Sequence, residues 1–345
     1  MRALVFRKAG LLEMATVADP TPGPGQAVIE VTAAGVCGTD YHLVAGELGV
    51  PAGTIPGHET AGRVVEIGPG VDGLALGDAV VCYGQVVCGS CAACRSGHEN
   101  RCMQPEGFGM ARPGGFAEYL VAPASCLLPL PDGVDAEIAA IATDAIATPF
   151  HALDSIAALR PGERVTVVGA GGLGLHAVAL ARLMGAGRVA VADPSPEART
   201  LALAVGADDV LDPAAVTEPG RELRALAGGA HAAFEFVGRA GSVEVALQSL
   251  GAGGRLVVVG VGHDRPQLPP IIRFVGMELS VRGSFGSTRT DISTVLALLA
   301  GGRLDGSRSV SRRVGLDEAP GIFAGPAGPA RTVIKPAPGE GNTTR

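Results

Sequence analysis

Residues 165–193 constrain the fold of this chain more than any other segment, because their pattern fits one kind of local unit. An apolar run precedes glycines in G-x-G-x-x-G spacing, and a long apolar segment and a second apolar run follow, ending at Asp193. The first glycine permits a tight turn after a strand, the second lets a pyrophosphate approach the backbone, and the third lets a helix pack closely. The segment therefore predicts a dinucleotide-binding turn. Its residues are Gly169, Gly171, Gly172, Leu173 and Gly174.

Asp193 indicates which dinucleotide binds. It follows Gly174 by 19 residues (193 − 174), where an acid commonly bonds the adenosine ribose hydroxyls. Its charge would repel a 2′-phosphate, so we expect NAD rather than NADP. Arg199, slightly further along the chain, is a second candidate contact for the ribose. The glycine spacing alone is weak in a chain with 52 glycines, where an ordinary glycine-rich turn is the alternative. The strand, helix and acid together favour the dinucleotide.

Length and composition set the broad class. A chain of 345 residues suggests about two domains, and a hydrophobic fraction of 47% excludes a disordered chain. The net charge of −7, without a basic block, argues against nucleic acid as a partner. No run reaches the roughly 18 apolar residues of a membrane helix, and the N-terminal apolar run is too short for a signal peptide. We expect a cytoplasmic protein without membrane contact.

The pattern of the chain divides it into three regions. Residues 1–144 hold short β-type runs broken by glycine and proline, which predicts a small, irregular antiparallel barrel. Residues 145–283 alternate strands and helices, which predicts a doubly wound parallel sheet. Residues 284–345 should return to the first domain and end in a disordered tail. The strands expected in the parallel sheet are 165–169, 188–192, 209–211, 232–237, 254–260 and 278–283.

Four of the seven cysteines are spaced C-x2-C-x2-C-x7-C. They are Cys88, Cys91, Cys94 and Cys102. Four thiolates in so short a loop can close a tetrahedral zinc site without an open position, which is typical of structural zinc. An iron–sulfur cluster is the chemical alternative, and free or disulfide-linked thiols are the simplest one. We expect zinc, which would hold a loop that has little apolar content of its own.

A second set of possible ligands is scattered along the first region: Cys37, His58, Glu59 and Asp144. Taken singly, each has an ordinary explanation, such as a turn histidine, a solvated acid or a helix cap. Together they offer a thiolate, an imidazole and carboxylates. Catalytic zinc uses such mixed sets and keeps one position for water or substrate. The set predicts a catalytic metal site.

Several motifs occur in the order of a known family: VCGTDYH, PGHETAG, the four-cysteine loop, GAGGLG with Asp193, and ARTVIK. Over residues 1–335 the chain resembles the zinc-dependent medium-chain alcohol dehydrogenases. The resemblance implies a chaperonin-10-like (GroES-like) catalytic barrel and a Rossmann domain that binds NAD. It also implies a catalytic and a structural zinc ion in each subunit, and a homodimer or homotetramer formed through the edge of the Rossmann sheet.

The resemblance assigns Cys37, His58 and Asp144 to the catalytic zinc. Glu59 would be a further ligand or a carboxylate beside them. Many members carry cysteine at the position of Asp144, while others carry an acid, and a carboxylate leaves the zinc less electron-rich than a second thiolate. Whether Glu59 or Asp144 completes the set of ligands stays open at this point.

The remaining roles that the resemblance implies concern proton and hydride transfer. Thr39 would accept the hydrogen bond of the substrate hydroxyl, and His42 would pass the proton to solvent. Thr148 would touch the nicotinamide, and Arg331 would contact the pyrophosphate. Zinc would lower the pKa of the alcohol as a Lewis acid, and the hydride would move to NAD.

These features predict a zinc-dependent alcohol dehydrogenase that interconverts an alcohol and an aldehyde or ketone with NAD. Gly84 lies where relatives often carry a bulky side chain, so we expect a roomy pocket for secondary, cyclic or otherwise bulky alcohols. The expected lining is Leu48, Tyr83, Gly84 and Met110. A polyol, cyclitol or sugar dehydrogenase is the nearest alternative. Reduction of a C=C bond, as in quinone or enoyl reductases, and a non-enzymatic role are less favoured, because ligand and relay residues are present.

Overall fold

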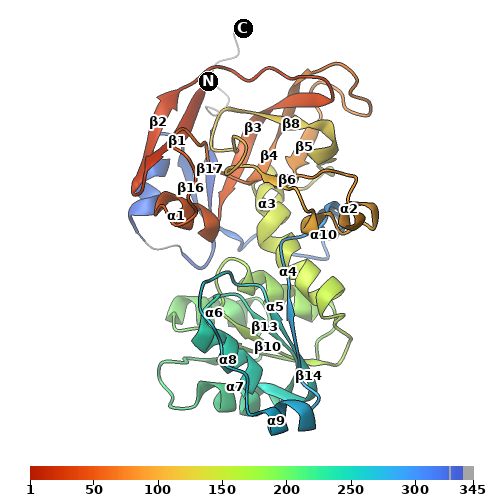
Figure 1. Ribbon diagram of the computed structural model, residues 1–345, viewed down its shortest axis with the longest axis vertical. Coiled ribbons are helices and arrows are strands. Elements are labelled where there is room, and N and C mark those ends of the chain that lie inside the picture. Colours follow the sequence, from red (N-terminus) through yellow and green to blue (C-terminus); the bar gives the residue numbers. More distant parts are fainter. Residues whose placement is uncertain (326–327, 337–345) are drawn as a thin grey trace. The chain divides into compact units, whose positions relative to one another are not determined.

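The computed structural model of the chain describes residues 1–325 and 328–336, which form two compact units (Figure 1). Unit 1 consists of Met1–Asp144 and Thr288–Arg345, and unit 2 of Ala145–Ser287. The chain therefore leaves unit 1 once and returns to it. The tail expected to be disordered lies outside the described residues from residue 337 onward.

Unit 1 is built on a sheet with the order β16-β17-β3-β4-β5-β9, in which β8 also pairs with β3. Neighbouring strands are antiparallel except for β16 and β17. Two further pairs are antiparallel as well, β1 (Arg2–Lys8) with β2 (Leu11–Thr16) and β6 (Gln85–Val86) with β7 (Glu106–Gly107). The main sheet comprises β3 (Gln26–Val36), β4 (Glu59–Ile67), β5 (Ala79–Cys82), β8 (Tyr119–Pro123), β9 (Leu127–Pro129), β16 (Val310–Gly315) and β17 (Arg331–Lys335). The antiparallel architecture predicted for this region is confirmed.

The longer helices of unit 1 have N-cap residues whose side chains accept backbone hydrogen bonds. Asp135 accepts hydrogen bonds from the backbone N–H groups of Glu137 and Ile138 at the start of α3 (Ala136–Ile141). Thr288 and Asp291 bond each other's backbone N–H at the start of α10 (Arg289–Ala300). The shorter helices are α1 (Gly38–Val44), α2 (Ala92–Arg95), η1 (Glu99–Arg101), η2 (Ala124–Cys126) and η5 (Ala319–Ala324).

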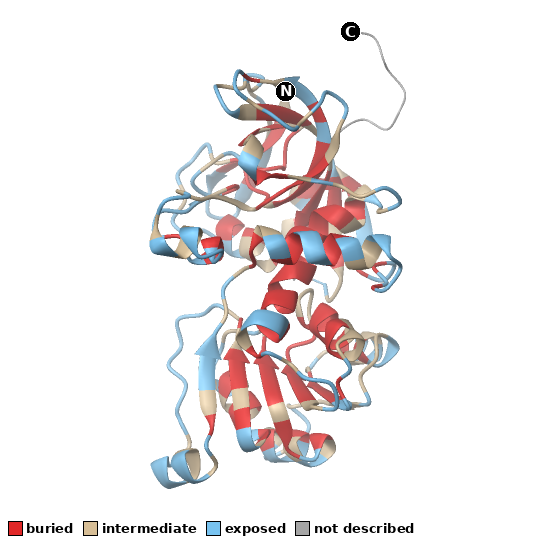
Figure 2. Ribbon diagram, turned by 90° about the vertical axis from the view of Figure 1, so that its right-hand side faces the viewer, coloured by how far each residue is buried: buried red, intermediate tan, exposed pale blue. Residues whose placement is uncertain are grey.

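Unit 2 contains a six-stranded parallel sheet with the order β12-β11-β10-β13-β14-β15. This is the doubly wound order, in which the chain starts at the centre and builds outward in both directions. The strands are β10 (Arg164–Val168), β11 (Arg188–Ala192), β12 (Asp209–Leu211), β13 (Ala230–Glu235), β14 (Leu250–Val258) and β15 (Ser280–Gly283). All six predicted strands are present, and the fold class is confirmed. Figure 2 shows the central strands buried and an edge strand exposed.

The helices of unit 2 follow from local signals. Ser195 caps α6, where Pro196 occupies the first turn, and Gly228 ends α7 in the left-handed conformation. Apolar residues of α7 and α8 pack on β10, β11, β13 and β14 to form a core. The helices are α4 (Ala147–His151), α5 (Gly174–Leu183), α6 (Pro196–Ala204), α7 (Pro219–Ala227), α8 (Ala240–Gln248) and α9 (Ile271–Gly276).

Two π-helical turns, η3 (Ala142–Ile146) and η4 (Ala152–Ile156), flank α4. None of the helices that residues 1–325 and 328–336 form combines the length and apolar character required to cross a bilayer.

Candidate functional site

The four cysteines of the 88–102 loop converge. Their sulfur atoms all lie within 4.8 Å of one another, and Cys88 Sγ is 3.9 Å from Cys94 Sγ. A tetrahedral site with Zn–S bonds of about 2.3 Å has S–S edges of about 3.8 Å. The geometry therefore fits zinc. All seven cysteines, each within the described residues, are free thiols rather than disulfides.

Hydrogen bonds within the loop favour the thiolate form of Cys88 and Cys91, whereas desolvation raises the pKa of Cys94. The N–H of Cys91 donates to Cys88 Sγ at 3.3 Å, and that of Cys88 donates to Cys102 Sγ at 3.3 Å. Hydrogen bonds from Ser90 and Cys91 lower the pKa of Cys88 to about 6. Since thiolates are the metal-binding form, Cys88 and Cys91 are the sulfurs that these hydrogen bonds prepare for a cation.

The second predicted ligand set also comes together. One ligand atom from each of Cys37, His58, Glu59 and Asp144 lies within 4.8 Å of the others. Cys37 Sγ is 3.3 Å and His58 Nε2 is 3.8 Å from Asp144 Oδ2. These separations match the edges, about 3.3–3.8 Å, of a tetrahedron with zinc bonds of about 2.0–2.3 Å.

Three elements of the fold bring these ligands together. Cys37 follows β3 directly and is the N-cap of α1, while His58 and Glu59 stand at the beginning of β4, the antiparallel neighbour of β3. Asp144 lies on the π-helical turn η3 after α3. Such turns replace the regular helical register locally and are frequent at functional sites.

The surroundings of the Glu59 carboxylate show whether this site fits a metal ion. Its side chain is fully buried, and neither carboxylate oxygen makes a hydrogen bond with the described residues. Burial raises its pKa, although the charge of Arg331 opposes the rise. A buried carboxylate that lacks hydrogen bonds is costly unless a cation lies close. Oε1 lies 2.8 Å from the guanidinium of Arg331, whereas Oε2 has no hydrogen-bond or ion-pair partner among the described residues. This second oxygen and the mixed donor set fit zinc.

Gly35 provides the space for Glu59, a role that the sequence did not reveal. The two residues are opposite each other in the β3–β4 ladder. A Cβ at position 35 would lie 2.0 Å from Glu59 Oε2 and 2.8 Å from Ile141 Cγ2. Any side chain at this position would displace the carboxylate.

Asp40 is a second residue whose role the sequence does not indicate. It is buried, its Oδ2 accepts the backbone N–H of Cys37 at 2.8 Å, and its Oδ1 is 3.7 Å from His58 Nδ1. Burial lowers the pKa of His58, but the charge of Asp40 and hydrogen bonds with Asp144 outweigh it and raise that pKa. A carboxylate on the far side of the ring orients a ligating imidazole so that Nε2 faces the metal.

Arg331 lies beside this ligand set. Its Nη2 is 2.8 Å from Glu59 Oε1 and 3.4 Å from both Cys37 Sγ and Asp144 Oδ2, and the residue is 7% exposed. The guanidinium thus neutralises part of the buried negative charge. The contact with a pyrophosphate that the family resemblance implied stays a prediction.

The two relay candidates lie on α1. Thr39 Oγ1 is 3.8 Å from Cys37 Sγ, so the hydroxyl lies next to the ligand set. His42 is exposed, and its Nδ1 is 2.6 Å from Glu47 Oε2. An ionised carboxylate only accepts hydrogen bonds, so Nδ1 donates, and in the neutral ring Nε2 is the atom that can accept a proton.

In unit 2, the glycine turn joins β10 to α5 as predicted. Gly169 has φ +89°, and a Cβ on Gly174 would lie 1.8 Å from the carbonyl oxygen of Gly169. A Cβ on Gly171 would meet no atom within 4 Å. The turn therefore needs its first glycine for the backbone conformation and its third for the close approach of helix to strand.

Asp193 contacts this turn from the end of β11. Its Oδ2 accepts the N–H of Ala170 at 2.7 Å, and its Oδ1 accepts that of Ser195 at 2.8 Å. Arg199 Nη1 donates to the carbonyl of Asp193 at 2.7 Å and is 3.2 Å from Asp212 Oδ2. The charge of Arg199 therefore already has a carboxylate partner.

The other predicted residues lie on separate segments. Thr148 is buried on α4, and Leu48 is 43% exposed on the loop after α1. Tyr83 is 3% exposed, and its hydroxyl accepts a hydrogen bond from Gln85 at 2.8 Å. A Cβ at Gly84 would lie 3.3 Å from the carbonyl oxygen of His58, and Met110 packs against Gly107. Among the four expected pocket residues, Gly84 therefore adjoins a predicted metal ligand.

Comparisons with known proteins agree with this description. A family model described as "Alcohol dehydrogenase GroES-like domain" matches residues 23–132, and one described as "Zinc-binding dehydrogenase" matches residues 172–301. An alcohol dehydrogenase of Geobacillus stearothermophilus is 36% identical over 323 residues, 92% of each chain. An L-threonine 3-dehydrogenase of Pyrococcus horikoshii is 37% identical over 268 residues, 76% of each chain.

A solved structure gives the same picture of the fold. It is that of a putative zinc-binding dehydrogenase from Sinorhizobium meliloti 1021 bound to NADP. The present chain superposes on it with a TM-score of 0.89 at 32% identity, and the match covers 97% of this chain and 99% of that one.

Proposed function

The chain belongs to the zinc-dependent medium-chain dehydrogenase/reductase family, and we propose that it exchanges a hydride between an alcohol and NAD. It is an oxidoreductase of a family that uses zinc and a nicotinamide dinucleotide. The products of alcohol oxidation would be an aldehyde or ketone and NADH. The observation that carries the proposal is the convergence of Cys37, His58, Glu59 and Asp144 in unit 1.

The residues of this set would play different parts in metal binding. We propose that Cys37, His58 and Asp144 hold the catalytic zinc, with Glu59 as the adjacent carboxylate. Zinc, when bound, supplies a Lewis acid that polarises the C–O group of the substrate. The cysteines of the 88–102 loop would hold the structural zinc.

Thr39 and His42 would remove the proton of the alcohol. The Thr39 hydroxyl lies beside the ligand set and would accept the substrate's hydrogen bond. Because Glu47 accepts from Nδ1 of His42, Nε2 is the atom that would take the proton. The ring is exposed, so it can pass the proton on to water.

We propose a preference for NAD over NADP. The carboxylate of Asp193 lies at the glycine turn, and its negative charge opposes a 2′-phosphate. Arg199 is paired with Asp212 and with backbone carbonyls, so it offers little charge to a phosphate. The NADP bound to the Sinorhizobium protein makes the choice of dinucleotide worth measuring directly.

The proposed substrates are secondary, cyclic or otherwise bulky alcohols. A Cβ at Gly84 would lie 3.3 Å from the carbonyl oxygen of His58, so this glycine places no side chain against the segment that carries a predicted zinc ligand. The Pyrococcus relative is named for the oxidation of threonine, whose hydroxyl is secondary. A polyol, cyclitol or sugar alcohol is the alternative substrate class on the same site.

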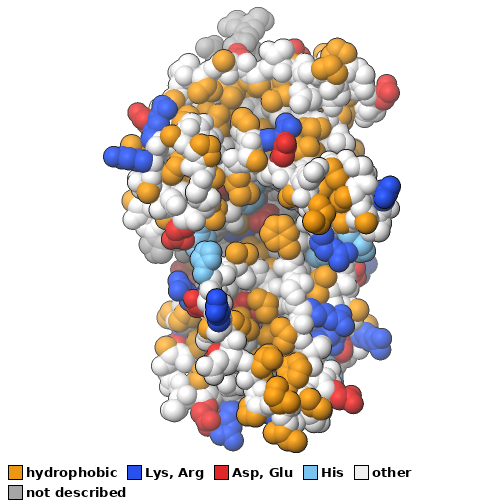
Figure 3. Space-filling model, viewed as in Figure 1, with side chains coloured by type: hydrophobic (Ala, Val, Ile, Leu, Met, Phe, Trp, Pro, Cys, Tyr) orange, Lys and Arg blue, Asp and Glu red, His pale blue; other side chains and the backbone are white. Residues whose placement is uncertain are grey.

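We propose that the chain forms a homodimer or homotetramer through unit 2. Strand β15 lies at the edge of the parallel sheet, and Val281 and Phe285 are 41% and 63% exposed. Hydrophobic side chains also gather on the surface where Figure 1 draws α9 (Figure 3). Exposed strand edges and apolar patches are typical of subunit interfaces. The cytoplasmic location stays a prediction.

One experiment tests the proposed activity and substrate class. NADH formation would be followed with a panel of primary, secondary, cyclic and polyol alcohols, with zinc content measured on the same sample. We expect the highest kcat/KM with secondary or cyclic alcohols. A profile that peaks at ethanol and falls with size would contradict the substrate class, and a profile that peaks with polyols would favour the alternative.

A further inference from the structure

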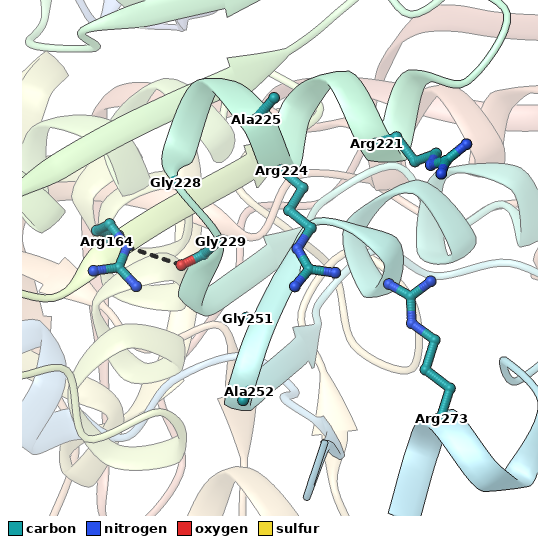
Figure 4. A pocket seen from close by; sticks show the side chains of 9 residues that line it. All are labelled: Arg164, Arg221, Arg224, Ala225, Gly228, Gly229, Gly251, Ala252 and Arg273. Carbon is teal, nitrogen blue, oxygen red and sulfur yellow. Dashed lines mark hydrogen bonds between the residues drawn. The ribbon is translucent and has the colours of Figure 1, made fainter. Parts of the chain in front are cut away.

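A cleft of about 580 Å³ opens in unit 2 at the amino ends of three parallel strands (Figure 4). Arg164 is the first residue of β10, Gly229 directly precedes β13, and Gly251 is near the start of β14. The glycine turn follows the carboxyl end of β10, about 17 Å away for a strand of this length. The cleft is therefore distinct from the predicted dinucleotide site.

The walls of the cleft carry positive charge only. The arginines are Arg164 from β10, Arg221 and Arg224 from α7, and Arg273 from α9. The rest of the lining consists of alanine and glycine: Ala225, Gly228, Gly229, Gly251 and Ala252. No lining residue is acidic, although the whole chain has a net charge of −7. The local excess of arginine is therefore not a consequence of a basic chain.

Two of these arginines already have hydrogen-bond or ion-pair partners within the chain. Arg164 Nε donates to the carbonyl of Gly229 at 2.9 Å, and Arg221 Nη1 is 2.7 Å from Glu218 Oε2. The nearby carboxylate of Glu163 is held by Arg255, at 2.9 and 2.5 Å. It is thus not available to the cleft.

Arg224 and Arg273 differ from the other two. Within the part of the chain that the structure describes, their guanidinium groups make no hydrogen bond or ion pair. Both residues are partly buried, and Figure 4 shows their side chains extending from different helices toward the same space. Like charges that share a partly buried cleft repel each other, and a bound anion would relieve that repulsion.

Two glycines, Gly228 and Gly229, leave part of the cleft lining without side chains. Gly228 and Gly229 have φ of +71° and +79°, a conformation that disfavours side chains. A Cβ on Gly229 would lie 3.3 Å from Gly251 Cα and 3.9 Å from Arg224 Nε. A ligand can therefore lie against backbone between the arginines.

We propose that this cleft binds a small phosphate-bearing molecule, with Arg224 and Arg273 as its principal contacts. The planar guanidinium group matches the oxygens of phosphate in a two-pronged arrangement, which makes arginine the preferred residue for phosphate recognition. The volume lies within the range of small-molecule sites, about 300–1,000 Å³, and exceeds the needs of one inorganic phosphate. The site goes beyond the proposed dehydrogenase activity and does not depend on it.

Calorimetric titration of the full chain with pyrophosphate tests the proposal. The titration is run at constant ionic strength, with and without saturating NAD, because pyrophosphate also resembles part of a dinucleotide. The variants are Arg224→Gln, Arg273→Gln and the double variant. The control is Arg265→Gln, which removes an exposed arginine of unit 2 outside the cleft. Circular dichroism and NAD affinity verify that each variant folds.

We expect saturable binding at one site per chain that NAD does not abolish. Each single substitution should weaken binding at least about tenfold, since hydrogen bonds to charged groups are strong, and Arg265→Gln should leave it unchanged. Inorganic phosphate and glucose 6-phosphate, titrated in parallel, distinguish free phosphate from a phosphorylated metabolite.

Three results would overturn the assignment. The first is pyrophosphate affinity that the double variant retains. The second is binding that NAD competes away completely, which would place the anion at the glycine turn. The third is binding of polyglutamate without binding of any phosphate compound, which would identify the cleft as a docking site for an acidic protein segment.

Discussion

Glu59 and Arg331 form an ion pair in the interior of unit 1, with 2.8 Å between Oε1 and Nη2. Glu59 is fully buried and Arg331 is 7% exposed, so water compensates neither charge. The same guanidinium is 3.4 Å from Cys37 Sγ and from Asp144 Oδ2. Arg331 therefore balances a ligand set whose groups would otherwise repel one another.

Removal of Arg331 should destabilise the protein strongly. In Arg331→Met the Glu59 carboxylate loses its counter-charge, and breaking one side of a buried pair costs about 3–5 kcal/mol. Urea unfolding of metal-free protein measures the effect. The double variant Glu59→Gln/Arg331→Met should lose less than the sum of the single variants. Additive losses would contradict a direct interaction between the two side chains.

Substitution of Gly35 should disturb the metal site through packing. The Cβ of Gly35→Ala would lie 2.0 Å from Glu59 Oε2, so the carboxylate or strand β3 must move, at a cost of about 1–3 kcal/mol. We expect lower stability and weaker zinc retention, measured by unfolding and by metal analysis after dialysis. Gly38→Ala is the control, because its Cβ would meet no atom within 4 Å. Equal behaviour of the two variants would refute the explanation.

Loss of one cysteine of the 88–102 loop should remove one zinc ion and loosen the loop. Cys91→Ser is expected to lower the zinc content from about two to about one per chain, because four thiolates close the structural site. Cleavage by a protease within residues 88–102 should become faster. Cys126→Ala, which lies outside both ligand sets, should retain both ions. Full zinc content in Cys91→Ser would exclude the assigned site.

Neutralisation of Asp193 should change the choice of dinucleotide. Asp193→Asn removes the charge that opposes a 2′-phosphate and keeps one oxygen, which can accept one of the two backbone N–H groups that Asp193 binds. We expect the ratio of kcat/KM for NAD to that for NADP to fall by about tenfold or more, a free-energy change of about 1.4 kcal/mol. A ratio that does not change, or a native enzyme equally efficient with both, would rule out Asp193 as the selecting residue.

The sequence allowed prediction of those features that depend on local pattern. The glycine turn, the four-cysteine loop and the Ser195 cap each lie within a short segment whose residue types determine its geometry. The six strands of unit 2 were also predicted, because apolar runs between helical segments identify buried parallel strands. Their ends were less accurate, since β13 and β14 each begin earlier than expected.

Features that depend on contacts between distant segments could not be predicted from the sequence. Nothing in the sequence marks the π-helical turn that carries Asp144, or the pairing of Gly35 with Glu59 across two strands. The position of Arg331 follows from the pairing of β17 with β3, which come from opposite parts of the chain. The arginine cleft likewise combines a strand and two helices that share no motif.

We propose that the set of Cys37, His58, Glu59 and Asp144 holds a zinc ion required for NAD-linked alcohol oxidation. The most direct measurement compares zinc content and NADH formation in the native protein and in His58→Gln, with the best alcohol of the panel. We predict that zinc falls from about two to about one per chain and that kcat drops at least about a hundredfold, while NAD binding is unchanged. Native rates of NADH formation in a His58→Gln protein that has lost this zinc would contradict the account.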